Sequence, residues 1–344
     1  MNKLEERKEV KETVRPVRGM FILGIGSILL LLSLVLAVSL GSADMSLQTV
    51  WQSIFQFDSG VQQHQIIREI RFPRIFGAAI VGSCFAVAGA LMQGMTRNPL
   101  ADSGLLGLNA GAVFMLACCF AFFPYLPYLY MILFSFLGAA LGAGIVYGVG
   151  SLSKNGLTPI RLVLAGAAVS ALLGALSEGI ALYYEIGQDL AFWYAGGISG
   201  INWSHLQIIT PWLLLALIAA MTVSRSITLL SLGEEVAVGL GIKTGRVKLT
   251  ASFIIVVLAG LAVSVVGAVS FVGLMVPHIV RWFIGQDYRW IIPGTVIYGA
   301  LLVVLADLAA RTISPPHEMP IGALIALLGV PFFLYLARKG GGMV

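Results

Sequence analysis

Apolar runs separated by short polar segments make up most of this chain. Hydropathy predicts nine membrane-spanning helices, near residues 20–40, 75–94, 105–123, 128–150, 160–184, 206–224, 249–269, 291–313 and 320–337. A tenth, shorter run at 271–284, which begins FVGLMVP, has the length of a re-entrant or half-spanning helix. The pattern therefore predicts an all-α, polytopic membrane protein with about ten transmembrane helices.

The composition supports a single membrane domain. Of the 344 residues, 58% are hydrophobic and 11% are charged, whereas soluble proteins average roughly 45–50% apolar and 25% charged residues. One domain over 19–339 accounts for the apolar runs, and no soluble catalytic domain fits beside it. We interpret 1–18 as a retained cytoplasmic tail, because no small-residue cleavage site follows the first apolar run, and 340–344 as a short cytoplasmic end.

The distribution of Lys and Arg predicts the orientation, since cytoplasmic loops carry an excess of both. With the tail inside and ten spans, 17 of the 21 basic residues fall on the cytoplasmic side. Nine spans would place Arg338 and Lys339 outside and reduce this asymmetry. We therefore expect ten spans, with both termini cytoplasmic, in a multi-pass protein of the cell membrane.

Four basic residues remain on the outer side: Arg68, Arg71, Arg74 and Arg311. Basic residues are unfavoured on the outer side, and three of these four lie at the ends of apolar helices, so a function or a partner is expected for them. Arg311 could simply pair with Asp307, four residues earlier on the same helix. No such neighbour is evident for Arg71 or Arg74, for which snorkelling at the membrane interface is the structural alternative.

The longest polar stretch between spans lies at 225–248 and contains LGEEVAVGLGI at 232–242. This segment is too short and too polar to span a bilayer. Its apolar and acidic residues, bounded by glycines, predict short helices with one face available to a soluble partner. An ordinary surface loop is the alternative reading.

Several further features have mainly structural interpretations. We expect an interfacial helix within 44–70 and close helix packing at Gly138, Gly142, Gly144 and Gly148. Glu178 and Asp307 are acidic residues within apolar spans, and a structural role is favoured for both. Cys84, Cys118, Cys119 and His278 are expected to be packing residues, since metal-ligand spacing is lacking.

A set of ordered motifs carries a resemblance to the ABC importer permeases that take up iron siderophores, haem and cobalamin. The match runs nearly end to end. Its motifs are RFPR at 71–74, GALMQ at 89–93, NPLA at 98–101, LGLNAGA at 106–112, LAG at 164–166, LGEEVA at 232–237, FVGLMVPHIVR at 271–281, AD at 306–307 with Arg311, and EMPIG at 318–322.

The resemblance implies a cobalamin-importer-permease-like fold, a permease dimer of two copies or of two paralogues, and a path at the dimer axis. It implies two cytoplasmic ABC ATPases that bind the segment near 225–248, through Gly233, Glu234, Glu235, Ala237, Gly239, Leu240 and Gly241. It also implies that an extracytoplasmic binding protein presents carboxylates to Arg71, Arg74 and Arg311. Asn98, Pro99 and Leu100 resemble the inner gate, and loop 151–159 is a second gate candidate; an ordinary turn is the alternative for both.

The function expected from this resemblance is ATP-driven uptake of a ferric siderophore, with ferric hydroxamate as the first choice. Haem, cobalamin and catecholate siderophores stay open as cargo. The chain lacks the dipeptide GlyLys and hence a phosphate-binding loop, so ATP hydrolysis is expected in a separate chain. No cofactor, metal site or nucleic-acid partner is expected. A proton-coupled secondary carrier is the main alternative, and an intramembrane enzyme is remote because HExxH and GxSxG are absent.

Overall fold

Residues 16–41, 45–151, 159–195, 197–315 and 317–340 are described by the computed structural model. The second gate candidate, loop 151–159, lies mostly outside these described residues. The elements in chain order are α1 (Pro16–Ser39), α2 (Leu47–Phe55), α3 (Gln62–Gln65), the π-helix η1 (Ile66–Arg71), α4 (Phe72–Thr96), the 3-10 helix η2 (Ser103–Leu106), α5 (Leu108–Phe122), α6 (Tyr128–Ser151), α7 (Pro159–Tyr183), α8 (Gly187–Ala195), α9 (Trp203–Ser231), α10 (Glu234–Gly239), α11 (Thr244–Val266), α12 (Val272–Ile284), α13 (Tyr288–Thr312) and α14 (Ile321–Gly340).

The number of apolar helices agrees with the ten predicted spans. Within the described residues, seven helices are long and apolar enough to cross a membrane, and three shorter apolar helices accompany them: Leu108–Phe122, Val272–Ile284 and Ile321–Leu336. The tenth predicted run is the 13-residue helix α12. At about 1.5 Å per residue it extends about 20 Å, less than the bilayer core, as its sequence length predicted.

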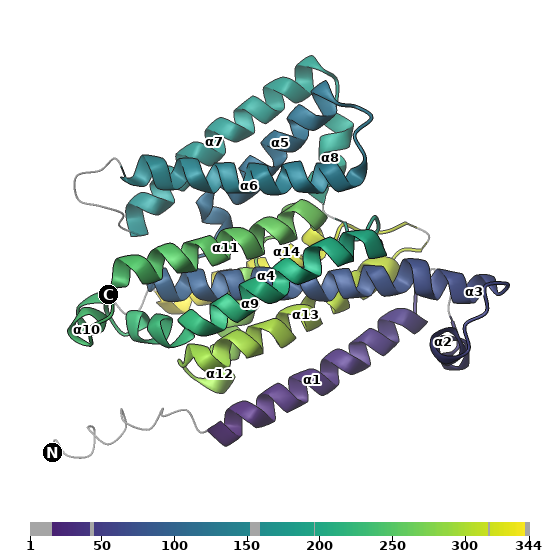
Figure 1. Ribbon diagram of the computed structural model, residues 1–344, viewed down its shortest axis with the longest axis horizontal. Helices are drawn as coiled ribbons and strands as arrows, with labels where there is room; N and C mark the ends of the chain where they lie inside the picture. Colours follow the sequence, from purple (N-terminus) through teal and green to yellow (C-terminus); the bar gives the residue numbers. More distant parts are fainter. Residues whose placement is uncertain (1–15, 42–44, 152–158, 196, 316, 341–344) are drawn as a thin grey trace.

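The helices lie roughly side by side, so the molecule has two distinct ends (Figure 1). Helix α10 lies at one end, together with the start of α1 and the end of α14. Helices α2 and α3 lie at the other end, where α2 is viewed nearly along its own axis and therefore runs across the spans. Because α1 starts and α14 finishes at the same end, the fold has the even number of crossings that the charge distribution favoured. We refer to these as the α10 end and the α2 end.

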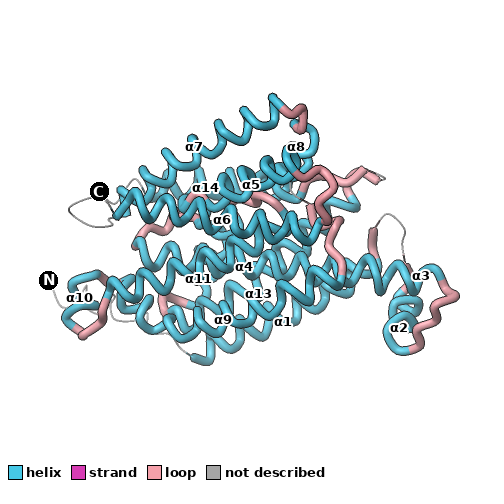
Figure 2. Tube along the Cα trace, turned by 45° about the horizontal axis from the view of Figure 1, so that its top comes forward, coloured by secondary structure: helices cyan, strands magenta, loops and turns pink. Residues whose placement is uncertain are grey.

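Helix α4 forms the centre of the bundle, between α11, α9, α13 and α12 (Figures 1 and 2). Most of its residues are buried, and close backbone contacts explain its small side chains. A Cβ atom at Gly82 would lie 2.1 Å from the carbonyl oxygen of Gly299 on α13, and one at Gly89 would lie 1.9 Å from that of Gly273 on α12. Such contacts are possible only between glycines, and they let helices approach closely in a membrane.

Helices α5, α6 and α7 form a layer along one side of α11 and α4. The glycines of α6 divide into two groups here. Gly138 and Gly142 face α5, where a Cβ atom at Gly138 would lie 2.3 Å from the carbonyl oxygen of Gly111, whereas Gly144 meets nothing within 4 Å. A Cβ atom at Gly148 also meets nothing within 4 Å, so the predicted close packing is confirmed for Gly138 and Gly142 and wrong for Gly144 and Gly148.

The predicted interfacial helix is present as α2. Its N-cap is Ser46, whose hydroxyl accepts a hydrogen bond from the backbone N–H of Thr49. Trp51 and Phe55 on α2 are largely exposed, with ring centroids 4.3 Å apart, while Val50 is buried. An exposed apolar face on a helix that crosses the direction of the spans fits a helix lying at a membrane surface.

Candidate functional sites

At the α2 end, three arginines and two carboxylates gather between α1, α4 and α13. We call Arg71, Arg74, Asp307, Arg311 and Glu318 the arginine cluster. Arg71 ends the π-helix η1, Arg74 belongs to the first turn of α4, Asp307 and Arg311 lie in the last turns of α13, and Glu318 precedes α14. The cluster thus joins residues from opposite halves of the chain, and it contains all three arginines that the sequence motifs singled out.

Arg71 and Arg311 bind the C-terminal end of α1. The Nη1 of Arg71 donates to the carbonyl oxygens of Val38 and Ser39, the latter at 3.2 Å. Arg311 donates to the carbonyl oxygens of Ala37 and Leu40 at 3.2 and 3.4 Å. The last four carbonyl groups of a helix lack partners within the helix and carry partial negative charge, so two guanidinium groups both satisfy and neutralise them.

Arg74 binds two carboxylates at once. Its Nε donates to Oδ1 of Asp307 at 2.9 Å, and its Nη1 and Nη2 donate to Oε1 and Oε2 of Glu318 at 2.7 and 3.0 Å. Arg311 completes the arrangement, with its Nε 3.1 Å from Oδ2 of Asp307. Asp307 therefore lies between two guanidinium groups, while Glu318 faces one of them in the bidentate geometry that carboxylates prefer.

These contacts correct one sequence-based expectation and confirm another. No carboxylate partner was evident for Arg74, yet it binds Asp307 and Glu318, which lie more than 230 residues away in the chain. The pairing of Arg311 with Asp307 on the same helix is confirmed. Arg71, Arg74 and Arg311 are only 6–8% exposed, so in this chain they are buried groups rather than free surface charges.

Glu318 is the accessible member of the cluster. Its side chain is 46% exposed, against 9% for Arg74 and 1% for Asp307. Hydrogen bonds from Arg74 lower the pKa of the Glu318 carboxyl below its ordinary value, so it is charged at neutral pH. An approaching group would therefore meet this carboxylate before it meets the guanidinium of Arg74.

Arg68, the fourth outward arginine, stands apart from the cluster. Its guanidinium lies 4.5 Å from the centre of the Phe57 ring, and its side chain is exposed. The backbone carbonyl of Arg68 accepts a hydrogen bond from Nε1 of Trp203. It is the arginine of this end that a partner could reach directly.

At the α10 end, the polar segment predicted to meet a partner forms a short helix between two glycines. Helix α10 has Gly233 (φ 140°) before it and Gly241 (φ 80°) shortly after it, conformations that L side chains rarely adopt. Ala237 is fully buried and anchors the helix to the bundle. Of the predicted coupling residues, Ala237 therefore has no side-chain surface to offer, whereas Leu240 is 61% exposed.

The apolar residues of this segment were expected to face a partner, but three exposed apolar side chains were left out of the selected coupling residues. Leu232, Val236 and Val238 are 63%, 48% and 57% exposed. Together with Leu240 they give the segment an exposed apolar surface. These residues lie in the same short segment as the glycines and glutamates that were chosen. Glu235 is exposed as well, while Glu234 forms an ion pair with Lys248 of α11 at 2.6 Å.

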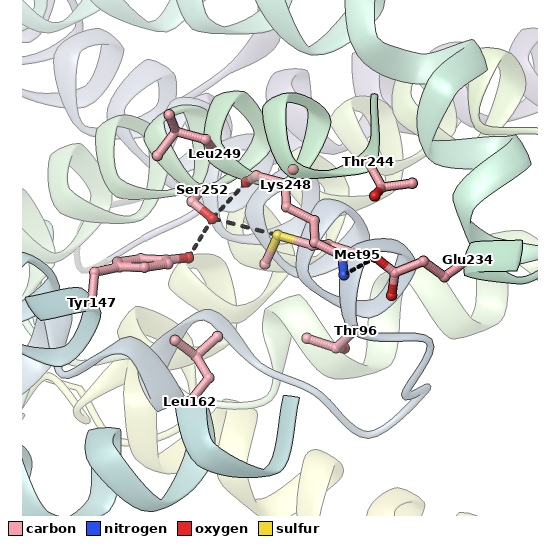
Figure 3. Close-up of a pocket in the computed structure, with 10 residues that line it drawn as sticks. Met95, Thr96, Tyr147, Leu162, Glu234, Thr244, Lys248, Leu249 and Ser252 are labelled. Carbon is pink, nitrogen blue, oxygen red and sulfur yellow. Dashed lines mark hydrogen bonds and ion pairs between the residues drawn. The ribbon is translucent and has the colours of Figure 1, made fainter. Parts of the chain in front are cut away.

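Beside α10 lies a cavity of about 390 Å³ between α4, α6, α7 and α11 (Figure 3). Glu234 and Lys248 form one side of it, and Met95 and Thr96 at the end of α4 form another. Ser252 donates to the carbonyl oxygen of Lys248 at 2.7 Å and also receives the hydroxyl of Tyr147 from α6. The cavity therefore separates α10 from the end of α4 and from the start of α7.

The predicted gate residues follow directly after this end of α4. Arg97 adopts a left-handed conformation (φ 54°) and ends the helix. The side chain of Asn98 accepts a hydrogen bond from the N–H of Leu100 at 2.9 Å, and Pro99 continues the turn. Asn98 and Pro99 are exposed and Leu100 is half-buried, so the turn lies at the surface of this chain within reach of the cavity.

His278 and Glu178 are ionisable residues within the apolar helices, and they differ in their surroundings. His278 packs its ring against Trp282 and Phe332, with centroids 4.9 and 5.8 Å apart, as expected of a packing histidine. Glu178 is exposed on α7, unlike Asp307. Among the residues that the structure describes, no group of three His, Cys, Asp or Glu side chains could hold a metal ion.

A bundle of about ten apolar helices, with a charged cluster at one end and a projecting helix at the other, is typical of a multi-pass membrane transport protein. Comparison with known proteins agrees. The model of the FecCD transport family matches residues 29–339. The chain is 47% identical over 332 residues to the iron(3+)-hydroxamate import system permease protein of Bacillus subtilis (strain 168), covering 96% of this chain and 86% of that one.

A second relative is the iron-uptake system permease protein of the same organism, 40% identical over 90% of this chain and 93% of that one. Among solved structures, a metal-chelate type ABC transporter in an inward-facing conformation superposes with a TM-score of 0.81, at 28% identity, over 92% of this chain and 99% of that one. The chain therefore belongs to the FecCD transport family. It is a membrane transport subunit of the ABC importer type.

Proposed function

We propose that this chain is the permease subunit of an ATP-driven importer that carries ferric hydroxamate siderophores into the cytoplasm. The observation that supports the cargo is the 47% identity, over 96% of the chain, to a permease whose name specifies iron(3+)-hydroxamate import. Other relatives are named for different chelates at lower identity, such as ferric enterobactin at 36%. The cargo passes intact, and the chain carries out no covalent chemistry.

The importer needs a motor, which we assign to two separate cytoplasmic ATPase subunits. The chain has no GlyLys dipeptide and hence no phosphate-binding loop of the usual kind. The exposed side chains of Leu232, Val236, Val238 and Leu240 offer an apolar surface of the kind that docks into a groove of a partner. The α10 end, with both termini, is then cytoplasmic, in agreement with the excess of basic residues.

At the opposite, outer end, we propose that a binding protein loaded with the chelate docks over the arginine cluster and Arg68. Three guanidinium groups against two carboxylates leave this cluster with a net positive charge, which favours an acidic partner surface. Solvent and salt screen such contacts, so they set orientation and association rate more than affinity. A second permease, identical or paralogous, completes the translocation path.

The path opens alternately to the two sides of the membrane. ATP binding brings the two ATPases together, and α10 moves with the ATPase to which it is docked. The cavity beside α10 gives this movement room, and Met95 and Thr96 at the end of α4, just before the turn of Asn98, Pro99 and Leu100, line another side of it. A displacement of α10 therefore reaches the proposed gate through Met95 and Thr96 without disturbing the packed centre of α4.

Uptake of radioactive iron tests the proposal. Cells with and without the chain receive iron as ferric trihydroxamate, ferric catecholate and ferric citrate, with ATP depleted or the proton gradient collapsed in parallel. We expect loss of ferric trihydroxamate uptake alone, with a requirement for ATP. Unchanged uptake of every iron chelate would redirect the search to haem and cobalamin, and independence from ATP would favour a proton-coupled carrier.

A further inference from the structure

The most unusual feature of the arginine cluster is that its one accessible member occupies the place that a partner would take. The two terminal nitrogens of Arg74, Nη1 and Nη2, bind the two oxygens of Glu318 at 2.7 and 3.0 Å, and Nη2 also lies 2.9 Å from Oδ1 of Asp307. Glu318 belongs to the segment between α13 and α14, not to a helix. The site on Arg74 is thus already shaped for a carboxylate, and a carboxylate of this chain fills it.

We propose that Glu318 is an exchangeable stand-in for a carboxylate of the docking protein, which displaces it from Arg74 when the two proteins meet. This inference rests on the docking function proposed above and adds how docking proceeds. The partner's chemistry is that of an exposed Asp or Glu side chain that can bind the Arg74 guanidinium with both oxygens.

The exchange is physically reasonable because it leaves the number of ionic hydrogen bonds unchanged. Without Glu318, Arg74 would keep Asp307, but its Nη1 would lose its charged acceptor, and an unmet donor on a side chain only 9% exposed is costly. Glu318 keeps the site paired in the free permease. After the exchange its own carboxylate is close to water, because the side chain is already 46% exposed in the pair.

Asp307 cannot take part in the same exchange. Its side chain is 1% exposed and contacts both Arg74 and Arg311, so its release would leave two buried charges without their shared partner. Asp307 therefore acts as the fixed element that orients Arg74, and Glu318 is the replaceable one. This division assigns different roles to two carboxylates that bind the same guanidinium.

Displacement of Glu318 also has a consequence for the bundle. Glu318 lies three residues before the start of α14 at Ile321, and the adjacent Met319 is tied to α13 by a hydrogen bond from its N–H to the carbonyl of Ala310 at 3.1 Å. Release of Glu318 removes one of the connections that hold the start of α14 against α4 and α13. Docking at the outer surface thereby acts on a transmembrane helix.

The experiment compares Glu318→Gln with Glu69→Gln in the full permease–ATPase complex in nanodiscs, using the binding protein of the same system loaded with ferric trihydroxamate. Glu69 is an exposed glutamate at the same end, on η1, so its substitution changes the charge of the surface equally. Association and dissociation rates are measured by biolayer interferometry at low and physiological salt.

We expect Glu318→Gln to bind about three- to fivefold more tightly than Glu69→Gln, because a partly exposed competing ion pair is removed. A spin label on His317→Cys should become more mobile when the binding protein docks on the otherwise unchanged chain. Equal or weaker binding by Glu318→Gln, or an unchanged label, would overturn the exchange. If Arg74→Gln binds as well as the unsubstituted chain, the proposed docking function itself fails, whatever Glu318 does.

Discussion

The two ends of the molecule present their functional residues in opposite ways. At the α2 end, Arg71, Arg74 and Arg311 are 6–8% exposed and bind carboxylates and helix carbonyls, although they come from distant parts of the sequence. At the α10 end the exposed side chains come from one short segment, which a single buried alanine anchors. A site that binds by charge needs rigid, paired groups, whereas a site that transmits movement needs a small element with few attachments.

The strongest test of the rigid end is the removal of its shared carboxylate. Asp307→Asn should leave Arg74 and Arg311 without their common charged partner, and we expect a loss of about 3–5 kcal/mol in the free energy of unfolding. Unfolding in mixed detergent micelles measures it. Glu69→Gln, an exposed change at the same end, should stay within about 0.5 kcal/mol. Equal stability of the two variants would mean that the cluster is not a structural unit.

At the mobile end, the largest effect should appear in transport rather than in stability. Val238→Asp and Leu240→Asp place a charge on the proposed ATPase surface, and we expect ATP-driven uptake to fall about tenfold or more, as at the centre of a protein interface. Both side chains are exposed, so the amount of folded chain should be unchanged. Lys243→Gln, just beyond α10, is the control; normal uptake in both Asp variants would exclude this surface as the coupling site.

A finer test separates the shape of the arginines from their charge. Arg71→Lys and Arg311→Lys keep the positive charge but replace the planar, forked guanidinium by a compact ammonium that does not reproduce its geometry at the α1 carbonyls, so each should lose about 1–2 kcal/mol of stability. Arg68→Lys is the matched control, since Arg68 is exposed and outside the cluster. If all three variants are equally stable, attachment of α1 does not depend on the guanidinium geometry.

The fold could be predicted from the sequence much further than the sites. Runs of apolar residues and the placement of Lys and Arg predicted ten helices, including the short α12, because both signals are local or additive along the chain. The arginines of the α2 end were found by the same charge count. The pairing of Arg311 with Asp307 was found, because the two residues are four apart, but the partners of Arg74 were not, since Arg74 meets Glu318 across 244 residues and hydropathy carries no information on such pairs.

The missed residues of the α10 end have a different cause. Leu232, Val236 and Val238 look like ordinary members of an apolar membrane chain, and only the fold shows that they are exposed while Ala237 is buried. Helical periodicity could have indicated this, but six residues are too few for a reliable period. The cavity beside α10 is formed where several helices pack together, and the sequence alone does not show how these helices pack.

The smallest expected effect sharpens the contrast between paired charges at the two ends. Glu234 and Lys248 form an ion pair at 2.6 Å, but their side chains are 41% and 28% exposed, so Lys248→Met should change stability by no more than about 1 kcal/mol.

The Lys248 hydrogen bond lowers the pKa of Glu234, so this pair adds its stability above the ordinary glutamate range and loses it only as the pH falls through the lowered value. Unfolding measured between pH 6 and 8 should therefore show the same small difference between Lys248→Met and the unsubstituted chain. A loss comparable to that of Asp307→Asn would show that α10 is held as rigidly as the arginine cluster. In that case the helix could not move freely with a partner.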